Sequence, residues 1–379
     1  MQRGFTSPVE AVHRPTRYGH VDNLKVVLVS AVIVGHATMA WTGIGEWVLE
    51  EPHLRDPLLS IISLLLIGAM FGMAVFFFIA GTFTPASLTR KGLGRFLADR
   101  SLRLGLPMIF FIVVLSPLIE YFDTDNGGFE GSFWDFTLEI WWPPAPGPTW
   151  FLGVLLLFST VYAVTRTLSP RRTVSTSVLR GRHLLVAAGV VTVLSYVVRF
   201  VAPFGEERWR LSLSQSPGWV MGFVLGVLAA ERGWLSEVPL RIVRLTRNMA
   251  LAGVAAAVLV LVGTSILDIE VDSFAGGGTW QSLLFAAIEA TMVVSMPVWL
   301  LDLFRTRFHR QGPVLRAMSR AAFATFVVHQ LILVGLILAI RFVSWVPEVE
   351  YLVVSALAVA GSYLVGSWVV RIPGLARIV

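Results

Sequence analysis

Long apolar runs are the feature that most constrains this chain. The hydrocarbon core of a bilayer is ~30 Å thick, and a helix of ~20 residues crosses it. Of the 379 residues, 55% are hydrophobic and only 14% are charged, and a soluble domain of this length could not bury so much apolar surface. We therefore expect an all-α, polytopic membrane bundle of about ten transmembrane helices. The expected spans lie at roughly 24–41, 57–83 (long enough to tilt or to include an interfacial turn), 104–122, 150–168, 183–203, 217–235, 249–267, 281–303, 321–343 and 350–370.

The charged residues test this division independently. When the N-terminal segment and every second loop are placed inside, 25 of the 30 lysines and arginines fall on the inner side, the exceptions being Arg55, Arg199, Arg208, Arg210 and Arg341. Acidic residues show the reverse distribution, with 17 of 24 at or beyond the outer ends of the spans. The positive-inside rule predicts this alternation, so we expect both termini in the cytoplasm and the chain in the cell membrane. The net charge of +6 is then a topology signal, and nucleic acid is not an expected partner.

A single transmembrane domain accounts for most of the chain. We interpret residues 1–23 as a cytoplasmic tail, residues 24–371 as the transmembrane domain and residues 372–379 as a second cytoplasmic tail. The first apolar run begins near Leu24 and continues at transmembrane length, which is typical of a retained signal anchor. The sequence contains no cysteine, which excludes disulfides, thiolate metal sites and a cysteine nucleophile.

Three ionisable residues fall within the expected spans, where a charge is expensive and often functional: His36, Glu289 and His329. At ~1.5 Å per residue, His36 lies ~16 Å, His329 ~12 Å and Glu289 roughly 18 Å from the inner surface. All three could therefore share one layer near the midplane of the membrane. The alternative for each is a purely structural hydrogen bond between helices.

Basic residues near the inner ends of the first and third spans extend this pattern. Eleven residues at ~100° each place Lys25 and His36 within ~20° of each other on one face of the first helix. Arg100 and Arg103 are three residues apart, so in a helix they project to the same side and could grip one phosphate group. For all three cations the alternative is an ordinary positive-inside signal.

The longest connection, 123–149, precedes Trp150 and is rich in Asp, Gly and Pro. It carries Trp134, Trp141 and Trp142. These tryptophans are either part of an interfacial aromatic belt or a lip that faces a sugar, because aromatic rings stack on the apolar faces of pyranoses.

Several short elements follow one another along the chain: Asp22-Asn-Leu-Lys25 with Gly35-His36 ten residues on, Phe77-Phe78-Ile-Ala80-Gly81, Arg100 and Arg103 before Leu-Gly-Leu-Pro107, Gly147-Pro-Thr-Trp150-Phe-Leu152, and Ser319 through His329. Their order resembles that in the acyltransferase-3 family of membrane O-acyltransferases. Two of them depart from the usual pattern, since Lys25 replaces an arginine and Ala80 a serine. The fourth element is similar to the variant in the branch that contains glucan succinyltransferases.

This resemblance implies transfer of an acyl group from cytoplasmic acyl-CoA, with acetyl-CoA or succinyl-CoA as donor, to a hydroxyl of a sugar or glycan. A buried histidine suits the role of general base, and His36 is our candidate. The site residues implied are His36, Lys25, Glu289 and His329 for catalysis, Arg100, Arg103 and Lys25 for the donor, and Trp150, Trp142 and Asp22 for the acceptor. No metal is expected.

Two other functions remain open at this point. Intramembrane His and Glu also relay protons in secondary transporters, although such proteins usually show paired broken helices in two halves. A non-catalytic envelope-assembly or sensor protein could keep the same fold. Homo-oligomerisation is left open as well.

Overall fold

A computed structural model describes residues 19–43, 47–66, 70–122, 129, 131–140, 144–169, 177–208, 210–234, 238–267, 269–270 and 272–375. Within these ranges the fold is all-helical, and ten helices are long and apolar enough to cross a membrane. This confirms the predicted fold class. The ten are α1 (Gly19–Thr42), α3 (Gly72–Lys91), the composite α4 to α6 (Leu93–Glu120), η5 with α8 (Gly147–Leu168), α9 (Gly181–Val198), η6 with α10 (Leu213–Glu231), α11 (Leu240–Leu267), α13 (Trp280–Arg307), α14 (Pro313–Ile340) and α15 (Pro347–Val369).

The long apolar run at 57–83 does not form one helix. It contains the short helix α2 (Pro57–Leu66) and most of α3, which begins at Gly72 and continues to Lys91. Other short helical segments lie between the spans: α7 (Phe133–Asp135), η4 (Phe136–Ile140) and α12 (Asp272–Ala275).

The composite helix consists of α-helical pieces separated by π-helical turns. Its parts are α4 (Leu93–Arg100), η1 (Ser101–Gly105), α5 (Leu106–Phe110), η2 (Phe111–Leu115) and α6 (Ser116–Glu120). Pro107 and Pro117 each follow a π turn by two residues. A proline lacks the N–H of a regular helical hydrogen bond, and a wider turn before it accommodates that loss.

Glycines allow α3 and α10 to pack closely. A Cβ atom on Gly222 or Gly226 would collide with the carbonyl oxygen of Ala74 or Phe78, and a Cβ on Gly81 would collide with that of Phe223. Small residues four apart permit this backbone contact within a membrane, where apolar side chains gain little by associating.

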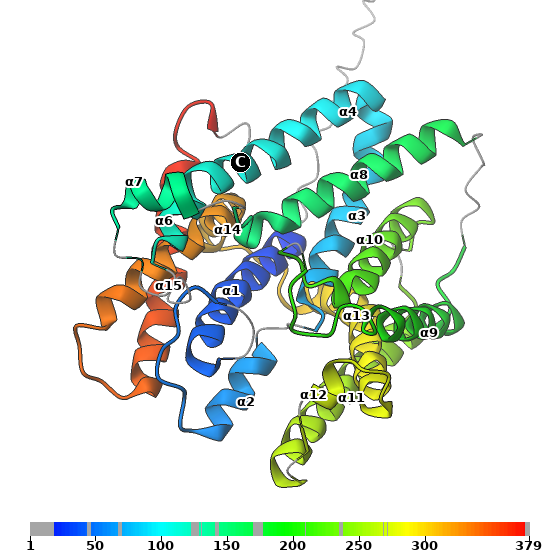
Figure 1. Ribbon diagram of the computed structural model, residues 1–379. Helices are drawn as coiled ribbons and strands as arrows, with labels where there is room; N and C mark the ends of the chain where they lie inside the picture. The colour runs from blue at the N-terminus through cyan, green and yellow to red at the C-terminus, as the bar shows by residue number, and fades with distance from the viewer. Residues whose placement is uncertain are drawn as a thin grey trace, which may run out of the picture.

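Helix α1 lies between the α14–α15 pair and the group formed by α3, α10 and α13 (Figure 1). Its first turn is fixed by the connection between α13 and α14. The side-chain nitrogen of Asn23 donates to the backbone carbonyl oxygens of Phe308, at 2.6 Å, and Arg310, at 3.0 Å. The side-chain nitrogen of Gln311 donates to the side-chain oxygen of Asn23 at 2.9 Å. The register of α1 relative to α14 is therefore held at this end.

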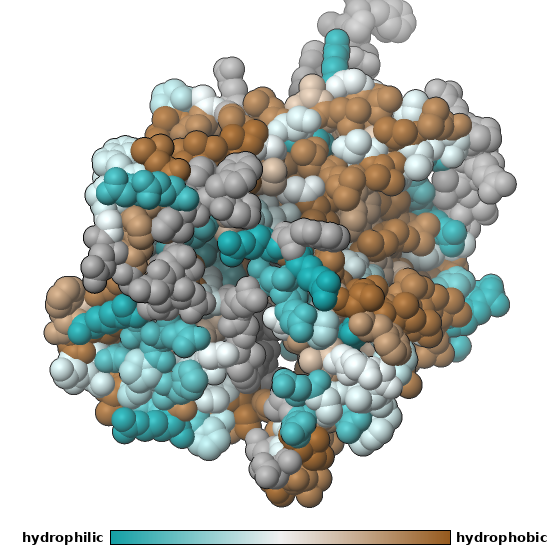
Figure 2. All heavy atoms as spheres, in the orientation of Figure 1, coloured by the Kyte–Doolittle hydropathy of each residue, from teal (hydrophilic) through white to brown (hydrophobic). Residues whose placement is uncertain are grey.

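Large apolar side chains remain exposed on the outer faces of several helices. On α9 they include Leu185 and Val186, and on α8 they include Leu157. Figure 2 shows apolar surface over the region of α8 and α9. A soluble protein rarely exposes patches of this extent, whereas lipid tails would cover them.

Candidate active site

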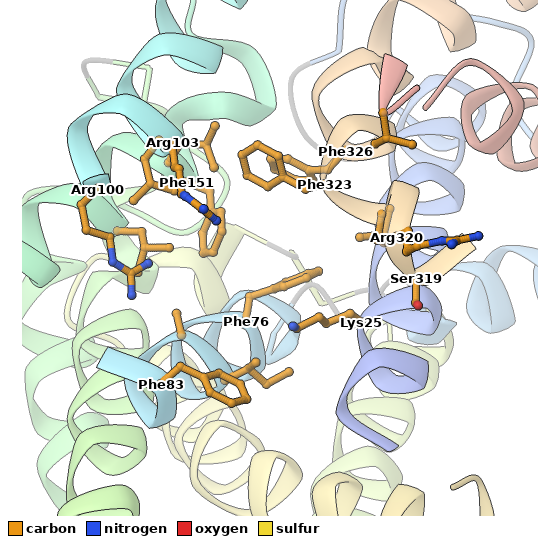
Figure 3. A pocket seen from close by; sticks show the side chains of 18 of the residues that line it. Lys25, Phe76, Phe83, Arg100, Arg103, Phe151, Ser319, Arg320, Phe323 and Phe326 are labelled. Atoms are coloured by element: carbon orange, nitrogen blue, oxygen red, sulfur yellow. The ribbon is translucent and has the colours of Figure 1, made fainter. Parts of the chain in front are cut away.

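A cavity of about 980 Å³ opens between α1, α3, η1, α8, α14 and α15. Five cationic residues line it, and no acidic residue is among the described residues that do: the five are Lys25, Arg100, Arg103, Arg320 and Arg371. The remaining wall is largely apolar and includes five phenylalanines: Phe76, Phe83, Phe151, Phe323 and Phe326. Figure 3 shows Arg100 and Arg103 on one wall, Ser319 and Arg320 on the opposite wall, and the nitrogen of Lys25 directed into the space between them.

The two arginines predicted to act together line the same wall. Arg103 pairs with Asp99 at 3.2 Å and keeps about half of its side chain exposed (53%). The Arg100 guanidinium lies over the Phe96 ring at 5.3 Å, and its Nε is buried without a hydrogen-bond partner among the described residues. A guanidinium N–H that is buried and unsatisfied favours an anionic ligand in the cavity.

Lys25 extends from the first turns of α1 into this cavity. Its Nζ lies 3.7 Å from the carboxylate of Asp22 and 5.5 Å from the centre of the Phe83 ring. Asp22 thus stands beside a cation of the cavity. Along the axis of α1, the helical rise places Lys25 ~16 Å from His36. Lys25 therefore lies with Arg100 and Arg103 in the cavity wall, about three helical turns from His36.

Arg320 and Arg371 were not singled out by the sequence analysis. Both counted there as inner-side charges, and nothing in their local sequence separates them from other such charges. Arg320 does stand one residue after Ser319, in the element that ends at His329. In Figure 3 the side chain of Arg320 extends away from Arg100 and Arg103, so Arg320 stands apart from those two cations.

The two histidines from the first and ninth spans are in direct contact. His36 Nδ1 lies 2.8 Å from His329 Nε2, and the two rings are nearly parallel, with centroids 5.0 Å apart. His329 Nδ1 lies 2.7 Å from the carbonyl oxygen of Phe326. Because a carbonyl only accepts, this Nδ1 carries a proton, and in a neutral His329 the Nε2 then accepts from Nδ1–H of His36. The unprotonated nitrogen of a neutral His36 is therefore Nε2.

His36 is the accessible member of this pair. It is only partly buried, whereas His329 has no exposed surface. The Trp47 ring, from the segment after α1, stacks on a face of His36, with centroids 4.8 Å apart. Trp47 had not been predicted as a site residue, and a tryptophan near a helix end gives no signal that separates it from an interfacial anchor.

The histidine pair lies deeper along the same helices than the cationic cavity. Phe326 lines the cavity, and its carbonyl oxygen accepts the proton of His329 Nδ1. On α1, Lys25 and Val29 line the cavity, and His36 follows two turns beyond Val29. The same two helices therefore carry a cation-lined cavity and a potential proton acceptor.

Comparison with known proteins agrees with this geometry. The family model described as an acyltransferase domain matches residues 18–367. The chain belongs to the acyltransferase-3 family. It is a membrane acyltransferase, and the match does not separate the branch of glucan-modifying enzymes from others. No curated protein and no solved structure gives a significant match.

In this acyltransferase Glu289 is paired away from the two histidines. Its carboxylate accepts from the Arg199 guanidinium at 2.6 Å, and both side chains are buried. The guanidinium also lies over the rings of Phe204 and Phe285, at 5.3 and 4.8 Å. The three ionisable residues therefore do not form one cluster: the structure brings together His36 and His329 and gives Glu289 a partner at the end of α9.

The tryptophans predicted for the acceptor differ in position. Trp150 begins α8 and packs on Trp219, with ring centroids 4.4 Å apart. Trp142 lies outside the described residues, as does Trp141. Among the described residues, no group of three or more His, Asp or Glu is arranged to hold a metal ion.

Proposed function

We propose that this acyltransferase moves an acyl group from cytoplasmic acyl-CoA to a hydroxyl of a carbohydrate or glycan acceptor at the cell membrane. One observation carries the proposal: the helices α1 and α14 that line the cation-rich cavity also hold, about two turns further along α1, a histidine whose unprotonated nitrogen is fixed by its neighbour. The family match supports acyl transfer over the transporter alternative.

The cavity suits the donor because coenzyme A carries several phosphates on an otherwise extended molecule. Arg100, Arg103 and Lys25 form one group of cations, and Arg320 provides further charge from the other side. Arg371 also lines the cavity. Guanidinium groups bind phosphate oxygens through paired hydrogen bonds. Acetyl-CoA and succinyl-CoA share this part of the molecule, so the cations serve either donor. With the N-terminus in the cytoplasm, the cavity opens to the side where acyl-CoA is present.

The proposed reaction uses His36 as general base. Nε2 takes the proton of the acceptor hydroxyl while the hydroxyl oxygen attacks the thioester carbonyl. The C–S bond then breaks, and the proton passes from Nε2 to the departing thiolate of coenzyme A. His329 holds the productive tautomer and continues to accept from Nδ1–H when the His36 ring is charged. Asp22, Trp142 and Trp150 remain candidates for acceptor contacts, and a catalytic role of Glu289 remains a prediction.

Acyl transfer by purified protein tests this proposal. Wild type, His36→Gln and a matched control, His309→Gln in an exposed connection, are incubated with acetyl-CoA or succinyl-CoA and a membrane glycan extract, and thiol release is followed. We expect His36→Gln to lower the rate roughly 10²–10⁴-fold, the usual contribution of general-base catalysis, and His309→Gln to have no effect. A near wild-type rate in His36→Gln would show that this histidine is structural.

A further inference from the structure

A second cavity, of about 660 Å³, lies on the other side of α3. Ile79 and Phe83 of α3 line both cavities and so form part of the wall between them. Its volume falls within the range of roughly 300–1,000 Å³ that is common for small-molecule sites. The mechanism above does not use it.

The walls of this second cavity are almost entirely apolar. Its deeper part is formed by Phe78, Leu184, Leu225, Val298 and Leu301, from α3, α9, α10 and α13. Thr82 in the middle of α3 is polar, and the charged or titratable lining residues lie near helix ends: His20 in the first turn of α1, and Asp302 and Arg305 near the end of α13. A single elongated apolar ligand with a polar end fits this distribution.

Arg305 is the one cation among the described residues that line the cavity, and further arginines stand beside other lining residues. Arg305 pairs with Asp302 at 2.8 Å, and Asp302 is the only acidic residue among the described lining residues. Trp234, another lining residue, has the Arg232 guanidinium over its ring at 5.4 Å. Arg180 and Arg182 follow at the start of α9, close to Leu184. Basic pockets between helices on the cytoplasmic side attract anionic lipid headgroups.

We propose that the second cavity binds an anionic phospholipid of the inner leaflet, with an acyl chain among the apolar walls and the phosphate near Arg305 and Arg232. The mouth is built from the first turns of α1 and α9 and the last turns of α10 and α13, which the charge distribution places at the cytoplasmic surface. The bound chain would contact Ile79 and Phe83 from the side opposite the donor cavity. The site is thus distinct from the donor site and does not depend on acyl transfer.

Lipid retention measured by native mass spectrometry tests this inference without an activity assay. Protein purified in detergent is incubated with phosphatidylglycerol or phosphatidylcholine of the same chain length. Ala230→Trp adds bulk in the cavity at the end of α10, and Ala255→Trp on the exposed face of α11 is the matched control. Ala86→Trp, at an exposed lining position of α3, fills the cavity independently if the first variant does not fold.

We expect wild type and Ala255→Trp to retain one phosphatidylglycerol in preference to phosphatidylcholine, and the two filling variants to lose it. Arg305→Gln should reduce the preference by about fivefold, the effect of one basic residue near an anionic headgroup. Equal retention of both lipids by wild type, or unchanged retention in both filling variants, would overturn the proposal.

Discussion

Replacing His329 tests whether the second histidine acts only by orienting the first. In His329→Leu, Nδ1–H of His36 loses the acceptor that now lies 2.8 Å away, in a part of the protein with little exposed surface. Leaving a buried donor unsatisfied costs about 1–3 kcal/mol, and the ring can avoid this penalty by changing tautomer or rotating. A change of tautomer protonates Nε2, and a rotation turns it away. In either case its lone pair is no longer available to the hydroxyl of the glycan that accepts the acyl group.

That energy sets the size of the expected effect. A range of about 1–3 kcal/mol corresponds to a fall in kcat of roughly 5- to 150-fold. The KM for acyl-CoA should stay constant, because the cations of the cavity lie at the other end of the site. His329→Gln retains an oxygen that can accept from Nδ1–H, so it should keep most of the activity.

Steady-state kinetics with varied acyl-CoA separates these effects, and ¹⁵N NMR of labelled histidine reports the tautomer directly. In wild type the His36 signal should show a protonated Nδ1 and an unprotonated Nε2, and in His329→Leu this preference should disappear. Full kcat in His329→Leu, or a loss confined to the donor KM, would refute the proposed orienting role.

Two further predictions concern the donor and the topology. Arg103→Ala should raise the donor KM by roughly 10- to 150-fold, because a charge-assisted hydrogen bond contributes about 1.5–3 kcal/mol, and leave the acceptor KM unchanged. Arg95→Ala is the control, because Arg95 is an exposed arginine of α4 outside the cavity. An unchanged donor KM in Arg103→Ala would mean that Arg103 acts only as a positive-inside topology signal. A single cysteine at Glu206 should be labelled by an impermeant reagent added from outside, whereas one at Arg244 should not. The opposite result would contradict the proposed orientation.

The sequence was sufficient for the helices and for part of the site. Lys25, Arg100 and Arg103 could be selected because their spacing on helices placed them at inner ends, and the structure brings them to one cavity. The similar depths of His36 and His329 suggested a shared layer, but their contact depends on how α1 packs against α14. Spacing within one helix carries no information on that packing.

Glu289 illustrates the limit of depth as evidence. Residues at equal depth in a bundle can face different neighbours, and the partner of Glu289 is Arg199, which the charge count had assigned to an outer loop. An arginine at the end of an apolar run is ambiguous from sequence alone, because it can enter the bundle or remain at the surface. Only the packing of α9 against α13 decides between these positions.

The π-helical turns of the composite helix have a consequence for comparing relatives. Such a turn holds one residue more than an α-helical turn, so it is equivalent to a single-residue insertion that the helix absorbs without a loop. Arg103 lies inside η1, and Arg100 immediately precedes it. A relative without this insertion would present the residue aligned with Arg103 about 100° further around the helix axis, away from the cavity. In a sequence alignment, the placement of a gap within the five residues of η1 therefore decides whether an arginine aligned with Arg103 lies on the same wall of the cavity.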